Sequence, residues 1–400
     1  MSVTSIRERM SGNEAVAEAI RQVNPDVMPA FPITPSTEIP QMVSSFIAGG
    51  KIDTEFIPVE SEHSAMSAAI GSEAAGARTM TATSSAGLAL MWEELLLAAS
   101  NRLPIVLTLV NRTLSGPINI NCDHSDGMGA RDTGWIQIYA ENNQEAYDNY
   151  IQAFPIAEDK RVHLPVMICQ DGFITSHAVE NILLLPDEQV KEFVGTYEPE
   201  EYLLQPGKPI AVGPYSISAY AMEAKKAQAV AMENAREVIK EVADRFAQMS
   251  GRQYGFFESY RLEDAEYVML IMGSAAGTAK QAVDELRESG VKAGVLKLRV
   301  FRPFPEKEIA EALKNAKAVA IMDRVESYNG NCGPLGSEVT AGLFRNKVFI
   351  DTVCYTYGLA GRDFTTDNVK EIFGELQGLV CEGKQVPHNR YIGLRTREEQ

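Results

Sequence analysis

The sequence predicts an α/β protein made of two consecutive α/β domains, the first with a doubly wound parallel sheet. In the first 180 residues, short apolar runs that end in polar or turn residues alternate with helix-like segments. The same kind of alternation begins again near residue 262, after a long connection rich in proline and acidic residues. Strands that alternate with helices are typical of parallel sheets, and 400 residues are too many for one ordinary core.

The first domain is expected to span residues 1–255. Four strands are expected at 54–61, 78–85, 103–112 and 162–172, with helices at 62–77 and 87–102. Thr, Ser, Asn, Arg and Asp follow several of these strands, and doubly wound sheets bind ligands at the carboxyl ends of their strands. Residues 186–215 read as a surface connection, and 219–249 as a long helix.

The second domain is expected to span residues 256–400. Its strands are expected at 265–274, 292–305, 317–325 and 346–361, and its helices at 275–290 and 306–316. The turn "GSAAGTA" (273–279) invites comparison with a dinucleotide-binding turn, but Ala275 replaces the second glycine of G-x-G-x-x-G and the expected acidic partner is missing. A plain strand-to-helix turn is therefore favoured over a nicotinamide site.

Composition excludes several classes of protein. The net charge of −17 argues against a nucleic-acid partner, which would require a basic face. No apolar run approaches the roughly 18 residues of a membrane span, and the N-terminal segment lacks an apolar signal core, so a cytoplasmic protein is expected. The five cysteines form no C-x-x-C pair and the five histidines are scattered, so we expect no disulfide framework, no iron–sulfur cluster and no metal ligated by this chain.

Residues 30–40, "AFPITPSTEIP", contain three prolines among hydroxyl side chains. Proline fixes φ and restricts the residue before it, so this stretch is expected to be a stiff loop, neither helix interior nor central strand. Stiff loops at strand ends are where α/β proteins place binding groups. The loop offers the hydroxyls of Thr34, Ser36 and Thr37.

Three further polar groups follow the predicted strands. Glu60 and Glu62 precede an alanine-rich helix, where burial favours a protonated carboxyl; the alternative is a pair of carboxylates stabilised by the helix dipole. Arg112 either clamps a substrate carboxylate or is a surface ion-pair residue. The segment 122–132, "CDHSDGMGARD", holds Asp123, His124, Asp126, Arg131 and Asp132 and is either a solvated loop with internal ion pairs or a functional segment.

Taken in chain order, these segments resemble the alpha chain of pyruvate:ferredoxin oxidoreductase. The motifs that carry the resemblance are "FPITPSTEIP", "ESEHSAMSAAIGSEAAGAR", "TATSSAGLALMWEEL", "NRTLSGPINI", "DHSD…RDTGWIQIYAENNQEAYD", "LKLRVFRPFP", "DR…GNCGPLG" and "YGLAGRD". The resemblance covers most of the chain. It implies a thiamine diphosphate enzyme that decarboxylates a 2-oxoacid, reduces ferredoxin and makes an acyl-CoA, in a reversible reaction. It also implies a transketolase C-terminal-like second domain.

The resemblance implies a role for each residue of the site. Thr34 contacts the substrate, Arg112 holds the substrate carboxylate, and Glu62 hydrogen-bonds the aminopyrimidine of the cofactor, with Pro32 and Ile33 also lining it. A protonated Glu62 suits this role, because proton exchange with the pyrimidine nitrogen favours the imino tautomer that activates the thiazolium carbon. The prolines then hold the substrate contact rigid.

The resemblance also implies partners. Thiamine diphosphate needs a divalent ion held by a G-D-G…N segment, and "QDGF" (170–173) matches this only in part. Mg²⁺ and [4Fe-4S] clusters are therefore expected in partner subunits: a beta subunit for the diphosphate side and a cluster, with gamma and ferredoxin-like delta subunits or a fusion. A dimer of heteromers is expected, with coenzyme A as co-substrate and ferredoxin as electron acceptor.

The alternatives concern the substrate and the role of the chain. Pyruvate is favoured, because "DHSD…RDTGW" resembles the pyruvate group most closely. An oxalate enzyme would require added positive charge near the corner loop, which "FPITP" does not offer, and a 2-oxoglutarate enzyme would require a second basic group. A branched-chain 2-oxoacid would change only the size of the site. In a different class, the chain would be a non-catalytic scaffold subunit, which the intact Thr34, Glu62 and Arg112 disfavour.

Overall fold

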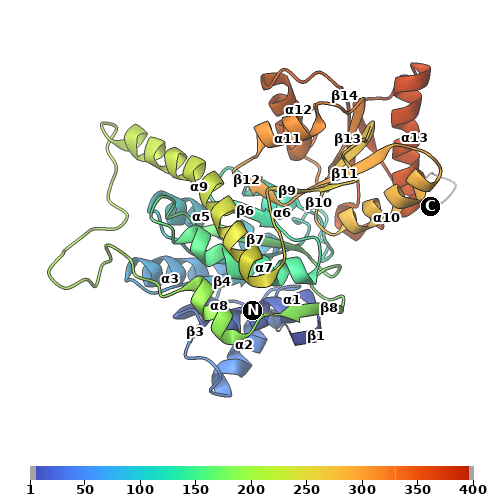
Figure 1. Cartoon of the computed structure of the whole chain (residues 1–400). Helices are drawn as coiled ribbons and strands as arrows, with labels where there is room; N and C mark the ends of the chain where they lie inside the picture. The colour runs from blue at the N-terminus through green and yellow to red at the C-terminus, as the bar shows by residue number, and fades with distance from the viewer. Residues whose placement is uncertain (1–5, 329, 396–400) are drawn as a thin grey trace.

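The computed structural model describes residues 6–328 and 330–395, and it contains two α/β domains, as predicted. Figure 1 shows the N-terminal domain from blue to green, with the orange and red C-terminal domain beside it. In the chain, the long helix α9 (Ala221–Ser250) lies between the strands and helices of the first domain and those of the second. The predicted boundary between residues 255 and 256 falls between this helix and strand β9 (Phe257–Tyr260), and it stays a prediction.

The first domain has a parallel sheet that is nearly continuous. The order β12–β6–β7–β5–β4 is continued by a β2–β3 pair, through a parallel bridge between Val27 and Thr79. Taken in sheet order, the strands β3, β2, β4, β5, β7 and β6 run parallel, and β12 is antiparallel to its neighbour β6. The strands are β2 (Val27–Ala30), β3 (Glu55–Pro58), β4 (Met80–Thr83), β5 (Val106–Asn111), β6 (Ile136–Tyr139), β7 (Val166–Asp171) and β12 (Val300–Arg302). The carboxyl ends of the six parallel strands, β2 to β7, therefore share one edge, where ligands of such sheets bind.

Helices cover both faces of this sheet. One apolar core joins the sheet to α1, α2, α7, α8 and α9, and a second core joins the other face to α3, α4 and α5. The helices are α1 (Gly12–Val23), α2 (Glu38–Ala48), α3 (Glu62–Ala74), α4 (Ser85–Leu90), α5 (Trp92–Ser100), α6 (Ser125–Gly129), α7 (Asn143–Ala157) and α8 (Asp187–Val194). The helix expected at 87–102 is thus two helices, which meet at Met91.

The second domain has a six-stranded sheet in the order β15–β14–β13–β10–β11–β9, in which only β9 is antiparallel. Its remaining strands are β10 (Tyr267–Met272), β11 (Ala293–Leu298), β13 (Ala318–Asp323), β14 (Asp351–Thr356) and β15 (Asn389–Tyr391). Helices α10 (Ala275–Glu288) and α13 (Thr366–Glu382) pack on one face, while α11 (Glu306–Leu313) and α12 (Pro334–Arg345) pack on the other. A short 3₁₀ turn follows β14 at Leu359–Gly361.

The strand expected at 292–305 is two strands that belong to different sheets. β11 lies in the second sheet, and β12 pairs with β6 of the first. The crossing occurs at Arg299, whose buried guanidinium donates to Asn149 and Gln152 of α7. An arginine between two apolar strands gives no sequence signal of a change of sheet.

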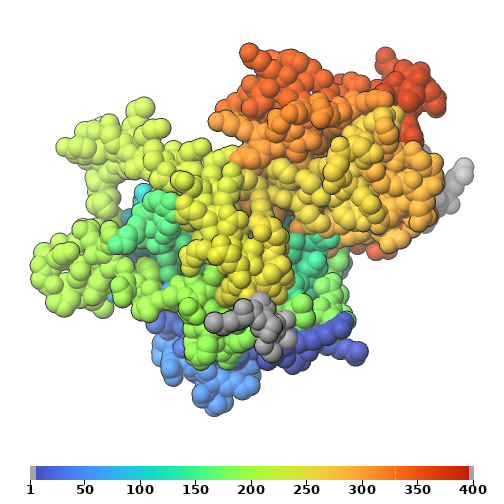
Figure 2. Space-filling view, in the orientation of Figure 1, coloured from blue at the N-terminus to red at the C-terminus, as the bar shows by residue number. Residues whose placement is uncertain are grey.

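The connection after β8 (Glu180–Leu184) was expected to be irregular, but it contains α8 and ends in an extended arm. Figure 2 shows the segment around 200–230 standing away from the body of the domain. Within residues 6–328 and 330–395, β8 pairs only with β1 (Ile6–Met10), as a separate antiparallel ribbon. Among the described residues, no helix is long and apolar enough to cross a membrane.

Candidate active site

The proline-rich corner follows β2 and leads into α2. Asn13 of α1 donates to the carbonyl of Pro35 at 2.9 Å, and the amide and hydroxyl of Ser36 both donate to the carbonyl of Ile33, at 2.9 and 2.8 Å. Pro35 and Ser36 are buried, whereas Pro32 and Thr34 are exposed. The buried part of the loop, Pro35 and Ser36, is therefore held by hydrogen bonds, whereas Pro32 and Thr34 face outward.

One part of the prediction for this stretch was wrong. Its last three residues, 38–40, form the first turn of α2, so Pro40 lies inside a helix. A proline is tolerated there because the first turn of a helix has no partner for its backbone N–H groups.

Arg112 lies directly after β5 and contacts the corner loop. Its Nη1 donates to the carbonyl of Thr34 at 3.0 Å, and its Nε donates to the carbonyl of Asn119 at 3.2 Å. The residue is 8% exposed, and no carboxylate of the described residues lies within ion-pair distance. A guanidinium this buried is normally paired with an anion, so Arg112 is free to bind an anionic ligand.

Glu62 is the first residue of α3 and is 7% exposed. Its carboxylate has no hydrogen-bond partner in the described part of the chain. It packs against Gly87 of α4, where a Cβ atom would lie 2.8 Å from its Oε1. Glu60 differs, since it is exposed and bonded to the Ser64 hydroxyl, which lowers its pKa. Of the two carboxyls that precede the alanine-rich helix in the sequence, only Glu62 is thus buried.

The end of β4 adds unpartnered hydroxyls beside Glu62. Thr83 and Ser84 are fully buried, and neither side-chain oxygen has a hydrogen-bond partner in the described chain. The Thr83 hydroxyl would lie 2.3 Å from a Cβ at Gly87, the same atom that would crowd Glu62. Buried polar groups without protein partners need another explanation, such as a ligand, an ion or water. These groups fit a polar, nitrogen-containing ring such as an aminopyrimidine.

The structure thus brings two of the predicted site residues into contact, Thr34 and Arg112, and sets Glu62 at the same sheet edge. The strands that carry them run side by side in the order β3–β2–β4–β5. The cofactor contacts expected of Pro32 and Ile33 stay predictions.

The acidic segment 122–132 is mostly buried, which the sequence left open. Asp123, His124 and Asp126 are at most 4% exposed, whereas the Arg131–Asp132 ion pair lies at the surface. Burial raises the pKa of Asp126 to about 6, against the opposing hydrogen bonds that it accepts.

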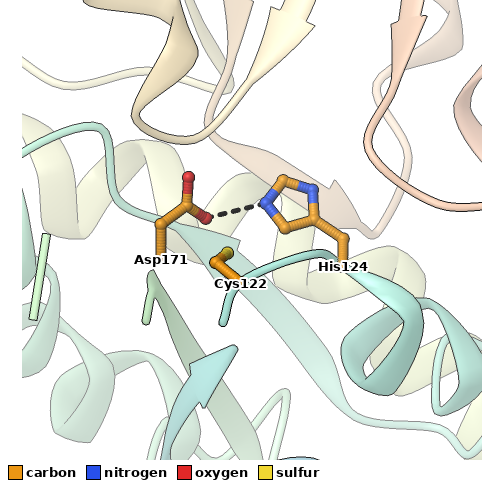
Figure 3. A group of neighbouring side chains, drawn as sticks. All are labelled: Cys122, His124 and Asp171. Carbon is orange, nitrogen blue, oxygen red and sulfur yellow. Dashed lines mark hydrogen bonds and ion pairs between the residues drawn. The ribbon is translucent and has the colours of Figure 1, made fainter. Parts of the chain in front are cut away.

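Asp171, at the end of β7, joins the two domains. Its Oδ1 contacts His124 Nε2 at 2.8 Å, and its Oδ2 accepts from Arg324 at 2.9 Å and from the amide of Ser274 at 2.9 Å. Burial disfavours its charge, but His124, Arg324 and the hydrogen bonds hold the pKa of Asp171 below its ordinary value. Figure 3 shows the His124 ring aimed at Asp171, with Cys122 beside them.

These three side chains have ligand atoms close enough to hold a metal ion, but the carboxylate of Asp171 is already bonded to a guanidinium. Asp171 therefore links His124 of the first domain to Arg324 and Ser274 of the second. It also accounts for the turn at 273–279, because the Ser274 amide binds Asp171. Arg324 pairs within the chain with Asp171 at 2.9 Å, and Arg302 pairs with Glu338 at 2.6 Å.

Two family models match the chain. Residues 18–244 match "Pyruvate flavodoxin/ferredoxin oxidoreductase, thiamine diP-binding", and residues 265–369 match "Pyruvate:ferredoxin oxidoreductase core domain II".

Curated relatives match over nearly the full length. The pyruvate synthase subunit PorA of Thermotoga maritima is 50% identical over 97% of this chain and 98% of its own length. The PorA subunit of Methanocaldococcus jannaschii is 47% identical over 92% of this chain and 94% of its own length. A ketoisovalerate oxidoreductase subunit, VorA of Pyrococcus horikoshii, is 44% identical over 96% of this chain and 97% of its own length.

Among solved structures, a 2-oxoglutarate:ferredoxin oxidoreductase from Magnetococcus marinus aligns over 93% of this chain and 65% of its own, with a TM-score of 0.69 and 18% identity. A split-gene transketolase aligns over 93% of this chain and 99% of its own, with a TM-score of 0.53 and 13% identity. These two likenesses support the fold. The relatives and family models confirm the resemblance that the motifs indicated: the chain belongs to the pyruvate:ferredoxin oxidoreductase family.

Proposed function

We propose that this chain is the alpha-type subunit of a pyruvate:ferredoxin oxidoreductase, and that it supplies the substrate clamp and the acid that binds the pyrimidine of thiamine diphosphate. The observation that carries the proposal is the buried guanidinium of Arg112, which has no carboxylate partner in the described chain and is bonded to the carbonyl of Thr34. A 2-oxoacid carboxylate matches the planar fork of an arginine.

Each residue then has one task. Arg112 binds and orients the substrate carboxylate, and the exposed hydroxyl of Thr34 lies on the same loop to contact the keto oxygen. Glu62 holds a proton at the pyrimidine nitrogen, because a buried carboxyl without protein partners is free to exchange it there. When bound, thiamine diphosphate supplies the carbon nucleophile and electron sink for decarboxylation. The rigid corner loop holds Thr34 and Arg112 in fixed positions relative to each other.

The chain is proposed to need partners. We propose a beta subunit for the diphosphate, Mg²⁺ and a cluster, further gamma and ferredoxin-like delta subunits, a dimer of such heteromers, coenzyme A as co-substrate and ferredoxin as acceptor, in the cytoplasm. The similarity to PorA and VorA supports an assembly of subunits. Pyruvate comes first, because the most similar relatives reported above are pyruvate synthase subunits. A branched-chain 2-oxoacid comes second, because the VorA subunit is nearly as similar.

The test uses the complex purified without oxygen. Coenzyme A-dependent reduction of a low-potential dye is followed with pyruvate, 2-ketoisovalerate, 2-oxoglutarate and oxalate. A rate with pyruvate far above the others supports the proposal, whereas a faster rate with 2-ketoisovalerate replaces the substrate and keeps the mechanism. No rate with any acid, from a complex that retains cofactor and clusters, refutes the catalytic role.

A matched pair of variants tests Glu62. Glu62→Gln removes the proton that the pyrimidine needs and should abolish turnover, while subunit assembly stays intact. Glu60→Gln changes an exposed carboxylate two residues away and should leave turnover unchanged. Normal turnover in Glu62→Gln would support the scaffold alternative.

A further inference from the structure

Asp126 is a buried residue beside the carboxyl ends of β4 and β5, and its carboxylate accepts four hydrogen bonds from N–H groups. Its Oδ2 accepts from the amide of Ser85 at 3.0 Å and from the amide of Arg112 at 2.9 Å. Its Oδ1 accepts from Asn111 Nδ2 at 2.8 Å and from the amide of Gly127 at 2.7 Å. The residue is 2% exposed. It therefore ties the ends of two neighbouring strands, β4 and β5, to one point.

The four donors of Asp126 are all neutral. No lysine, arginine or histidine of the described chain forms an ion pair with it, in contrast to Asp171, which pairs with Arg324. Burying a carboxylate without a cation is costly, and the four hydrogen bonds offset part of that cost. An asparagine of the same shape would turn one oxygen into an NH₂ group that faces two N–H donors, and both bonds on that side would be lost.

The segment that carries Asp126 also holds the two residues after Arg112. Thr113 donates from its hydroxyl to Asp123 Oδ2 at 2.9 Å, and the amide of Leu114 donates to the Ser125 hydroxyl at 2.8 Å. Three successive residues after β5 thus bind to three positions of the acidic segment.

The β4 side of this arrangement is conformationally restricted as well. Ser85 has φ of 45°, which is unusual for a residue other than glycine. Its amide binds Asp126, and its hydroxyl donates to the carbonyl of Thr113 at 2.5 Å. Such a backbone conformation persists where the surroundings hold it in place. The turn that begins α4, which also carries Gly87 against Glu62, is therefore held by the same carboxylate.

We propose that Asp126 is a positioning residue of the substrate clamp: by fixing the backbone of Arg112 and Ser85, it sets where the Arg112 guanidinium meets the substrate carboxylate. This proposal rests on the proposed role of Arg112. The arginine is held at both ends, since its amide binds Asp126 and its Nη1 binds the carbonyl of Thr34. Loss of the first anchor lets the guanidinium shift while the loop stays in place.

The test is the steady-state kinetics of the complex with Asp126→Asn, compared with Asp132→Asn. Asp132 belongs to the same segment, but its side chain is 72% exposed. Asp126→Asn should raise the KM for the 2-oxoacid by about tenfold or more, lower kcat by less, and leave the KM for coenzyme A unchanged. Asp132→Asn should behave as wild type. A uniform loss of kcat, or an unchanged KM for the 2-oxoacid, would overturn the proposal.

A double-mutant cycle with Arg112→Gln separates this inference from the proposed function. Because Asp126 acts through Arg112, adding Asp126→Asn to Arg112→Gln should raise the KM little further. If the two effects multiply, Asp126 does not act through Arg112 and the inference fails. If Arg112→Gln alone leaves the KM for the 2-oxoacid unchanged, the proposed clamp fails, whatever the effect at Asp126.

A milder variant covers the case in which Asp126→Asn does not assemble. Asn111→Ala removes one donor to Oδ1 and keeps the carboxylate with its other three bonds. It should raise the KM for the 2-oxoacid by roughly twofold to fivefold, with the KM for coenzyme A unchanged. An unchanged KM for the 2-oxoacid in this variant would also overturn the proposal.

Discussion

A methyl group added at Gly87 should impair catalysis while leaving the fold intact. Gly87 lies in α4 with its Cα facing Glu62, and a Cβ there would lie 2.8 Å from both Cγ and Oε1 of Glu62 and 2.3 Å from the Thr83 hydroxyl. Real Cβ atoms essentially never come closer than 3.0 Å to another heavy atom. Gly87→Ala must therefore push the Glu62 carboxylate away from the space that it faces.

The size of the effect follows from these distances. Ordinary contact begins at 3.4 Å, so the Glu62 side chain must move by roughly 0.6 Å and the Thr83 hydroxyl by roughly 1.1 Å, or α4 must shift by the larger of these distances. Displacements near 1 Å cost a positioned catalytic group about a hundredfold in rate, and we expect a loss of about tenfold to a hundredfold in kcat. The free energy of unfolding should fall by about 0–2 kcal/mol, because overpacking costs about 1–3 kcal/mol and alanine regains about 1 kcal/mol of helix propensity.

The assay compares Gly87→Ala with Gly71→Ala. Gly71 lies in α3, the helix that begins with Glu62, and a Cβ there meets nothing within 4 Å. Gly71→Ala should keep full turnover and raise the free energy of unfolding by up to about 1 kcal/mol. Dye-reduction kinetics and urea unfolding measure both quantities. Full turnover in Gly87→Ala, or an equal loss in both variants, would refute the close packing of Gly87 against a working Glu62.

Three further predictions follow from buried contacts. Burial raises the pKa of Glu73 from 4.5 to about 8, so the folded chain keeps a proton that the unfolded chain loses, and the free energy of unfolding falls as the pH rises between these values. Urea titrations from about pH 6 to about pH 8 should show that wild type loses about 2 kcal/mol more than Glu73→Gln. Equal losses would contradict the burial of Glu73. Asp171→Asn leaves a buried arginine unpaired and should lower the free energy of unfolding by about 3–5 kcal/mol, against no change for a surface Asp→Asn control. Gly172→Ala would set a methyl 2.4 Å from the carbonyl of Asn111 and 2.9 Å from Pro35, so the corner loop should shift and the KM for the 2-oxoacid rise about tenfold; an unchanged KM would show that the loop adapts.

The positions of Thr34 and Arg112 at the ends of parallel strands could be predicted from local signals, whereas their roles toward a substrate came only from the family resemblance. Prolines mark the corner after β2, and a polar residue follows the apolar run of β5. Parallel strands bring such ends to one edge of the sheet. The burial of Glu62 agrees with one of the two interpretations that the sequence left open for Glu60 and Glu62, but the sequence did not tell these two carboxyls apart.

The role of the acidic segment could not be predicted, because its partners are set by the fold. Asp126 looks like a residue of a solvated loop until Ser85, 41 positions earlier, is placed beside it. Asp171 belongs to "QDGF", which matches a metal-binding motif only in part, and its partners Ser274 and Arg324 lie 103 and 153 positions away. No local pattern connects residues at such separations.

Some elements were missed although their signals were present. α1 begins with a capping box formed by Ser11 and Glu14, and α13 with one formed by Thr365 and Asn368. These patterns mark helix starts. The break at Met91 and the change of sheet at Arg299 carry no such mark, because the residues on both sides continue the apolar pattern.

The return of β12 to the first sheet limits how this chain can be divided. A polypeptide that stopped at residue 255 would contain α9 and every other strand of the first sheet, yet β6 would lose its antiparallel neighbour. An open strand edge invites pairing with another molecule. The N-terminal half made alone should therefore self-associate, and a peptide that spans 296–304, supplied in trans, should suppress that association by taking the vacant position.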